Sequence, residues 1–428
     1  MLRHILILQR LHRACDEIMD AKRGIAKNTI YQMLAKVFSA GGTLIGTVLI
    51  TRLLGAETFG EYSVVTAFVL SFYILSDFGV NAVTAREFSK DESYAKGNFT
   101  SILVFRLMVG FLLLALALVV LRFMPYSIYI KRAILVGLTL IIFQSAFAAC
   151  TTIFQAHLGY KYYFFSVVAG NVVTLLALGF AVLSNWGLTC LAASLVLGSF
   201  VQVLLSLIFV RRFLAFSRSI VDYSLWRRTL LASLPLGMGL LLNTAMVQAD
   251  RFLLSILSTP YSVGVYNLSY KIFDFVLVFP TFFMNAAFPM FVRLEKESER
   301  RFRESFRKSV AMLSAASIFV TVLGVLLAPV LVPLIWGFRM SAVVVPLSIL
   351  ISGSLIFFVT SPLSWLLVIR NKQRFLPYIY SVALIFNVAF NVIFIPKYDY
   401  IASAVLTVLS ELIVLVGLVL VSKKLVCF

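Results

Sequence analysis

Charged side chains stand inside several long apolar stretches of this sequence. Lys36, Arg106, Lys271, Asp274 and Glu411 each lie well within such a stretch. An ionisable group in a water-poor environment is expensive, and it usually marks a binding site for a substrate or an ion, or a route for protons. The three cations are therefore candidates to bind an anionic group such as a phosphate. The two carboxylates are candidates to bind a coupling ion or a proton, or to pair with a cation.

Each of these residues also has a simpler explanation. Lys36 and Arg106 lie about two helical turns from the end of their stretches, so their side chains could reach the membrane surface. Lys271 and Asp274 are three positions apart and could form an ion pair along one helix. Glu411 has no basic residue three or four positions away and could be a neutral acid bonded to a neighbouring helix. The sequence leaves both explanations open for these residues.

Further polar residues lie closer to the ends of the stretches. Arg52 and the pair Asp250 and Arg251 are near outer ends, where they could form a gate or anchor the helices at the lipid headgroups. Asp77 is near an inner end, where helix capping or packing of a hairpin is the simpler role. A polar face that could line the path of a polar substrate comprises Asn243, Thr244 and Gln248.

The apolar stretches occupy almost the whole chain of 428 residues, of which 61% are hydrophobic and only 13% charged. About 20 apolar residues span a bilayer as a helix, and a helix satisfies its own backbone hydrogen bonds in lipid. The sequence therefore predicts an all-α polytopic membrane protein with about 12 transmembrane helices. The predicted spans are 30–54, 61–84, 99–122, 133–156, 162–184, 188–210, 229–254, 265–290, 309–335, 341–369, 375–396 and 400–422.

The distribution of Lys and Arg predicts the orientation of the chain. Most of them fall in the N-terminal segment, in every second loop after it and at the C-terminus, and few fall in the other loops. Cytoplasmic loops carry such an excess of basic residues, so both termini are expected on the cytoplasmic side of the cytoplasmic membrane. The net charge of +19 is then explained by contact with anionic lipids. We expect membrane lipids and no nucleic acid as partners.

An internal repeat divides the predicted helices into two sets of six. TRLLGAETFGEY (51–62) and DRFLLSILSTPYSVGVY (250–266) both have an Arg, then leucines, then Gly-x-Tyr at the start of the next span. Six is even, so both halves enter the membrane from the same side, as parallel repeats around a central cavity. The predicted units are a basic cytoplasmic or interfacial segment (1–28), an N-lobe with helices 1–6 (29–212), a cytoplasmic linker (213–228) and a C-lobe with helices 7–12 (229–428).

Several of these segments resemble one family of exporters. They are TRLLGAETFGEY (51–62), SDFGVNAVTAREFSK (76–90), DRFLL…VGVYNLSYKI (250–272), AAFPMFVRLEKE (286–297) and NVAFNVIFIPKYDYIASAVLTVLSELIVL (387–415). They are similar to the polysaccharide-transport branch, with its Wzx-type flippases, of the multidrug/oligosaccharidyl-lipid/polysaccharide exporter superfamily. Asp399 and Ala402–Ser403 stand near positions where that family usually carries glycines.

The resemblance implies a V-shaped pair of lobes that moves a polyprenyl-diphosphate-linked oligosaccharide across the membrane by alternating access, for cell-surface polysaccharide biosynthesis. It implies lipid-linked oligosaccharide as the substrate, and a glycan polymerase and glycosyltransferases of the same pathway as further partners. Cavity cations among Lys36, Arg106 and Lys271 would receive the diphosphate, with Asn243 and Gln248 along the glycan path.

Two other functions compete with this one. The first is a Na⁺- or H⁺-coupled small-molecule antiporter of the multidrug type, with Glu411 and Asp274 as coupling carboxylates. The second is a membrane glycan polymerase or glycosyltransferase, which we do not favour because no outer loop is long and no catalytic motif occurs. The four cysteines and three histidines are scattered, so we expect no metal site and no cofactor.

Overall fold

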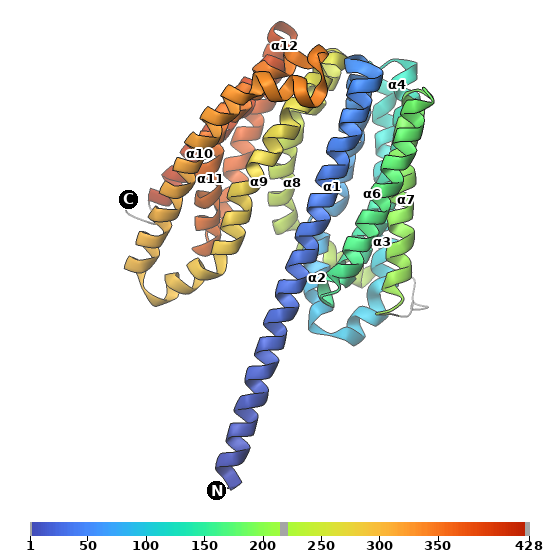
Figure 1. Cartoon of the computed structure of the whole chain (residues 1–428). Coiled ribbons are helices and arrows are strands. Elements are labelled where there is room, and N and C mark those ends of the chain that lie inside the picture. The colour runs from blue at the N-terminus through green and yellow to red at the C-terminus, as the bar shows by residue number, and fades with distance from the viewer. Residues whose placement is uncertain (1, 215–220, 424–428) are drawn as a thin grey trace.

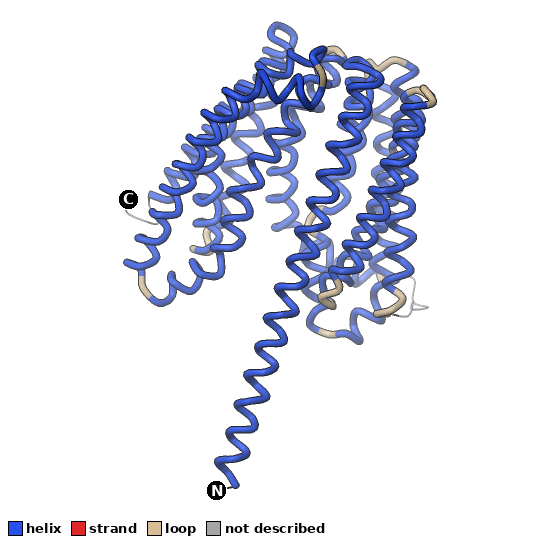
Figure 2. Tube along the Cα trace, in the orientation of Figure 1, coloured by secondary structure: helices blue, strands red, loops and turns tan. Residues whose placement is uncertain are grey.

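The computed structural model describes residues 2–214 and 221–423, without the side chains of residues 2–27 and of a few later positions that include Asn243. In this part of the chain the elements are helices, and the loops appear only as short segments between them (Figure 2). The helices are α1 (Leu2–Asp77), α2 (Val80–Lys90), α3 (Glu92–Phe123), α4 (Ile128–Gly137), α5 (Thr139–Ala156), α6 (Tyr160–Leu183), α7 (Leu188–Val210), α8 (Tyr223–Leu257), α9 (Pro260–Glu297), α10 (Glu299–Trp336), η1 (Phe338–Val343), α11 (Val344–Ile369), η2 (Gln373–Phe375) and α12 (Leu376–Lys423).

Two of these helices are hairpins that cross the bilayer twice. α1 turns at Gly55, whose φ of 88° is readily adopted only by glycine. α12 turns at Asp399, with φ 55° and ψ −141°. Nine described segments are long and apolar enough to span a membrane, and these two hairpins are among them. Counting both arms of each hairpin, and adding α8, gives the twelve crossings that the sequence predicts.

The chain crosses between two sides of the bundle, which we name by their connections. The proximal side carries Asp91 and the connections 157–159, 211–214 with 221–222, 298 and 370–372, and the distal side carries Gly55, 124–127, 184–187, 258–259, Gly337 and Asp399. Figure 1 shows α3, α4, α6 and α7 grouped on one side and α9 to α12 on the other. The two groups approach each other at the distal side and diverge toward the proximal side. These are the two six-helix lobes.

α8 begins earlier than the sequence predicts, at Tyr223 inside the expected linker 213–228. Asp222 caps it by accepting hydrogen bonds from the backbone of Ser224 and Leu225 at 3.0 Å each. These bonds, led by the one from Leu225, lower the pKa of Asp222. Trp226 is buried, and its indole Nε1 donates to the backbone oxygen of Ser101 in α3 at 3.1 Å. The first helix of the C-lobe therefore begins against the N-lobe.

The lobes meet at the distal side through the two repeated Gly-x-Tyr segments. A Cβ on Gly60 would lie 2.9 Å from the backbone nitrogen of Tyr261, and a Cβ on Gly264 would lie 3.0 Å from the Cα of Gly60. Only glycine permits such an approach of two backbones. Nearby, the Nε of Arg52 donates to the carbonyl of Ile335 at 3.0 Å, and its Nη2 donates to the carbonyl of Leu334. Arg52 thus connects α1 to the last turn of α10 in the other lobe.

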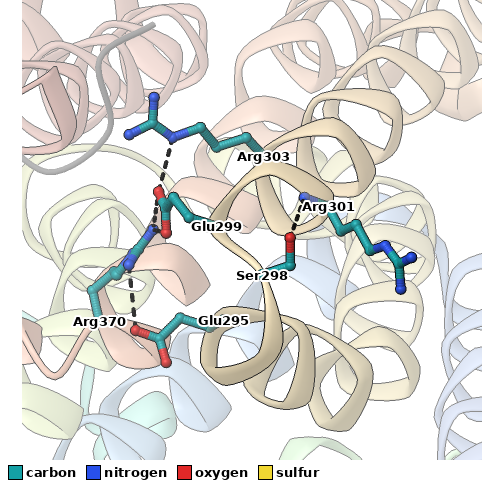
Figure 3. Close-up of polar contacts among 6 residues, drawn as sticks. All are labelled: Glu295, Ser298, Glu299, Arg301, Arg303 and Arg370. Carbon is teal, nitrogen blue, oxygen red and sulfur yellow. Dashed lines mark hydrogen bonds and ion pairs between the residues drawn. The ribbon is translucent and has the colours of Figure 1, made fainter.

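A network of ion pairs holds the proximal side of the C-lobe together (Figure 3). Arg370 lies 3.3 Å from Glu295 and 2.7 Å from Glu299, which also accepts from Arg303 at 2.8 Å. Residues 293–308 form a run of mixed charge that is divided at Ser298. The Ser298 hydroxyl caps α10 by accepting from the backbone of Arg301. The network joins the α9–α10 turn to the end of α11.

Replacing Asp399 by alanine is expected to destabilise the distal end of the C-lobe by about 1–3 kcal/mol. Asp399 accepts hydrogen bonds from the hydroxyls of Ser258 and Ser262, and its positive φ is unfavourable for alanine. Asp399→Gly removes the same hydrogen bonds but relieves the backbone, so it should cost less than Asp399→Ala. Thermal unfolding in detergent measures both, and equal losses would show that the backbone conformation contributes nothing.

Candidate functional site

A cavity of about 600 Å³ lies between the two lobes, and we call it the central cavity. The N-lobe contributes α1, α4, α5, α6 and α7 to its wall, and the C-lobe contributes α8 and α9. Its polar lining includes Ser39, Thr43, Gln144, Asn171, Gln202 and Asn267. Because both lobes form the wall, a relative movement of the lobes changes its shape and its access.

Three cations line the central cavity. Lys36 comes from α1, Arg251 from α8 and Lys271 from α9. The Lys36 ammonium lies 5.8 Å from the centre of the Phe282 ring, so it extends across to the C-lobe. No Asp or Glu occurs among the described residues that line this cavity. The central cavity therefore presents a net positive charge, which favours an anionic ligand.

Arg251 is held rigidly in the wall of the central cavity. Its Nη1 donates to Gln248 at 3.2 Å, its Nη2 contacts Asp274 at 3.3 Å, and its guanidinium lies 4.3 Å from the ring centre of Tyr270. The sequence left open whether Lys271 and Asp274 form an intrahelical ion pair, and the structure instead pairs Asp274 with Arg251 across two helices. Lys271 is thereby left to face the cavity.

The polar face expected on the seventh span is described only in part. Gln248 lines the central cavity and accepts a hydrogen bond from Arg251. The side chain of Asn243 lies outside the described part of the structure.

Arg106 does not line the central cavity and does not extend to a membrane surface. Its side chain is only 1% exposed, in the interior of the N-lobe. Its Nη2 lies 3.2 Å from Asp77 and donates to Asn81 at 2.7 Å, whereas Nε and Nη1 have no partner among the described residues. Neither sequence-based role of Arg106 fits this position. Asp77 pairs with Arg106 and also accepts from the backbone of Asn81 at 3.2 Å, across the α1–α2 break.

Removing Asp77 is expected to destabilise the protein more than removing Arg106. Asp77→Ala would leave a fully buried cation without its counter-charge, at a cost of about 3–5 kcal/mol. Arg106→Met would leave a carboxylate that is 38% exposed and can be hydrated, so its cost should be smaller. Thermal unfolding of both variants and of the double variant measures the difference. Greater damage from Arg106→Met would contradict this assignment.

Asp250 lies in the interior of the C-lobe, where it can neither gate the distal side nor anchor α8 at headgroups. Its carboxylate accepts four hydrogen bonds, at 2.6–3.0 Å, from Tyr266, Asn387, Asn391 and Thr407. No basic residue pairs with it within the described chain. Such a carboxylate is stabilised by its donors, and the oxygen-rich surroundings could also hold a proton or a small hard cation.

Glu411 is the second buried carboxylate of the C-lobe. It is 5% exposed and accepts a hydrogen bond from the hydroxyl of Thr360 in α11. This is the bonding to a neighbouring helix that the sequence left open as one alternative. In the described residues it has no ion pair, so it too could carry a proton.

Sequence reasoning missed most of the uncharged lining of the central cavity. The first span carries Lys36, Ser39, Thr43 and Thr47 at spacings of three and four residues, and all four line the cavity. This spacing places them on one helical face. Polar periodicity within an apolar span was therefore the available signal, and it was hidden because Ser and Thr also bond to their own helix backbone.

Comparison with protein families places most of the chain in a known family. The model of the family described as "Polysaccharide biosynthesis protein" matches residues 25–295. A comparison with curated protein sequences gives no significant match.

Solved structures of transporters are similar to this fold over nearly its full length. The lipid II flippase MurJ, in an inward closed conformation, has a TM-score of 0.73 at 12% identity, covering 92% of this chain and 87% of that chain. An inward-facing multidrug resistance MATE family transporter of the MOP superfamily has a TM-score of 0.72 at 13% identity, covering 90% and 94%. A MOP superfamily transporter from Pyrococcus furiosus has a TM-score of 0.62 at 14% identity, covering 94% and 95%.

Proposed function

Because the chain belongs to the polysaccharide biosynthesis protein family of the multidrug/oligosaccharidyl-lipid/polysaccharide exporter superfamily, we propose that it translocates a polyprenyl-diphosphate-linked oligosaccharide. The fold is that of a membrane transporter or flippase of this superfamily. The proposed movement runs from the cytoplasmic to the outer leaflet of the cytoplasmic membrane and supplies cell-surface polysaccharide synthesis.

The observation that carries this proposal is the charge of the central cavity. Lys36, Arg251 and Lys271 line it, and its described walls hold no carboxylate. A diphosphate needs such cations when it leaves water, and ammonium and guanidinium groups bind phosphate oxygens directly. The hydroxyl and amide groups of the lining would contact glycan hydroxyls. The polyprenyl tail can remain in the lipid between the diverging lobes (Figure 1).

The distribution of charge between the two sides supports the proposed direction of transport. The proximal turns carry most of the basic loop residues, including the network around Arg370 and Arg303. This excess supports a cytoplasmic proximal side and cytoplasmic termini. In that orientation the lobes meet on the outer side, and the arrangement corresponds to a state ready to take substrate from the inner leaflet.

Asp250 and Glu411 favour a second candidate, a Na⁺- or H⁺-coupled antiporter of small molecules. Both are buried in the C-lobe without a basic partner in the described chain. A carboxylate in that position exchanges ions or protons when access alternates. The positive central cavity weighs against cationic drugs as substrates, but the same carboxylates could couple an ion gradient to flipping.

The deciding experiment is reconstitution in proteoliposomes with a polyprenyl-diphosphate oligosaccharide placed in one leaflet. We expect the glycan to become accessible to a glycosidase on the other side only when the protein is present. Imposed Na⁺ and H⁺ gradients test coupling in the same vesicles. If no glycolipid moves, while a gradient drives uptake of a small solute, the antiporter replaces the flippase.

A further inference from the structure

A second cavity of about 260 Å³ lies beside the central cavity, and we call it the side cavity. Its wall comes from α1, α2, α5 and α6, so it belongs to the N-lobe alone. Lys36, Tyr73, Phe147 and Tyr163 line both cavities. The two spaces therefore share a wall, and Lys36 is the one cation in the described lining of the side cavity.

The side cavity is lined by polar groups that lack partners. The side-chain amides of Gln32 and Gln155 form no hydrogen bond within the described part of the chain, and neither do the hydroxyls of Tyr73, Tyr160 and Tyr163. None of these unpaired atoms is fully buried, so each remains accessible to solvent or to a ligand. Accessible donors and acceptors that converge on a small cavity are typical of a binding site for a polar, uncharged ligand.

Asn81 adds a hydrogen-bond donor, its side-chain Nδ2, whose orientation is set by Arg106. Arg106 donates from Nη2 to the Asn81 Oδ1 at 2.7 Å, and a guanidinium can only donate. The amide oxygen of Asn81 must therefore face Arg106, which leaves its Nδ2 for the side cavity. Arg106 is itself held by Asp77 at 3.2 Å. Arg106 thus acts as a positioning residue for Asn81, which explains a buried cation away from the central cavity.

Aromatic faces complete the wall. Phe147 and Tyr163 are stacked, with ring centres 5.6 Å apart, and Tyr160 meets Tyr163 edge-on at 6.1 Å. A sugar ring has an apolar face of C–H groups and an edge of hydroxyls. Aromatic rings can pack against the C–H face, and amide and phenol groups can form hydrogen bonds with the hydroxyl edge.

We propose that the side cavity binds the sugar that is bonded directly to the diphosphate. The inference rests on the proposed function, because it takes the diphosphate to lie among the cations of the central cavity. Lys36 stands in the shared wall, so a diphosphate beside it places the adjoining sugar at the entrance of the side cavity. Thr151 also lines the side cavity, and its hydroxyl donates to the Ala148 carbonyl at 2.8 Å, so it can accept from a ligand. Asn81, Gln155 and Thr151 then contact the hydroxyls of this sugar, and they determine which first sugar is accepted.

The test is equilibrium binding of short polyprenyl diphosphates to the purified full chain in detergent. The probes carry no sugar, one glucose, one galactose or one N-acetylglucosamine. We expect the wild type to bind at least one sugar-bearing probe more tightly than the bare diphosphate. Gln155→Leu and Thr151→Val, which change no charge, should each reduce that preference about three- to tenfold, as for the loss of one or two neutral hydrogen bonds. Both should leave affinity for the bare probe unchanged.

The control is Gln373→Leu, the same exchange at an exposed proximal position outside both cavities. It should alter neither affinity. Equal binding of all probes by the wild type would overturn the side-cavity proposal and leave the flippase standing. A parallel loss of affinity for bare and sugar-bearing probes in Gln155→Leu and Thr151→Val would also overturn it. Failure of the wild type to bind any probe would instead count against the proposed function itself.

Discussion

Replacing Lys271 by methionine is expected to reduce flipping of a polyprenyl-diphosphate oligosaccharide by about ten- to a hundredfold. Lys271 lines the central cavity, and its neighbour Asp274 forms an ion pair with Arg251 instead. A hydrogen bond to a charged group contributes about 1.5–3 kcal/mol, and each 1.4 kcal/mol corresponds to a factor of ten. The double variant with Lys36→Met should retain still less activity, because cations from both lobes are then removed. The glycosidase-accessibility assay in proteoliposomes measures the rates.

Two matched variants separate the effect of charge from damage to the fold. Lys271→Arg keeps a cation and should retain most of the activity. Lys296→Met makes the same exchange at an exposed position near the proximal end of α9 and should leave the flipping rate unchanged. If Lys271→Met and Lys36→Met together flip as fast as the wild type, the diphosphate does not bind where we place it.

The number and type of the helices could be predicted because the bilayer imposes one length and one composition on every span. The two tight reversals fall inside the predicted connections 55–60 and 397–399, but the backbone conformations that make them so short could not be predicted. Gly55 allows one tight reversal, and Asp399 makes the other at a position near which the resembling family usually has glycines. α8 begins at Tyr223, before the span predicted from 229, and the contact of the buried Trp226 with α3 that accompanies this early start has no local signal in the sequence.

The ionisable residues show where sequence reasoning ends. Their presence within apolar spans identifies them as important, and the structure brings Lys36, Arg251, Lys271 and Gln248 to one cavity. Their partners depend on neighbouring helices, which no local pattern records. Arg106, in α3, donates a hydrogen bond to Asn81 in α2. Asp250 has its donors in three segments that meet only after folding, namely Tyr266, the pair Asn387 and Asn391, and Thr407.

Replacing Gly60 by alanine is expected to open the distal contact between the lobes and to slow transport about tenfold or more. The new Cβ would collide with the backbone near Tyr261, and backbone cannot rotate away as a side chain does. Overpacking of this kind costs about 1–3 kcal/mol. Since the contact joins two lobes and not the interior of one, separation of the lobes can relieve the collision. The protein should therefore stay folded while its population shifts toward a distally open state.

Accessibility of the central cavity from the distal side measures this shift. A single cysteine at Thr43, in a background without the native cysteines, lines the cavity and can be labelled by a membrane-impermeant thiol reagent. We expect much faster labelling from the distal side in Gly60→Ala than in the parent. Gly179→Ala is the matched control, because a Cβ there meets no atom within 4 Å. Unchanged labelling together with lost transport would show that the Gly60 crossing does not act as the distal closure.

Arg52→Met, which frees the carbonyls of Leu334 and Ile335 at the same side, should change labelling in the same direction as Gly60→Ala. The change should be smaller, because this variant removes an attraction without adding a collision.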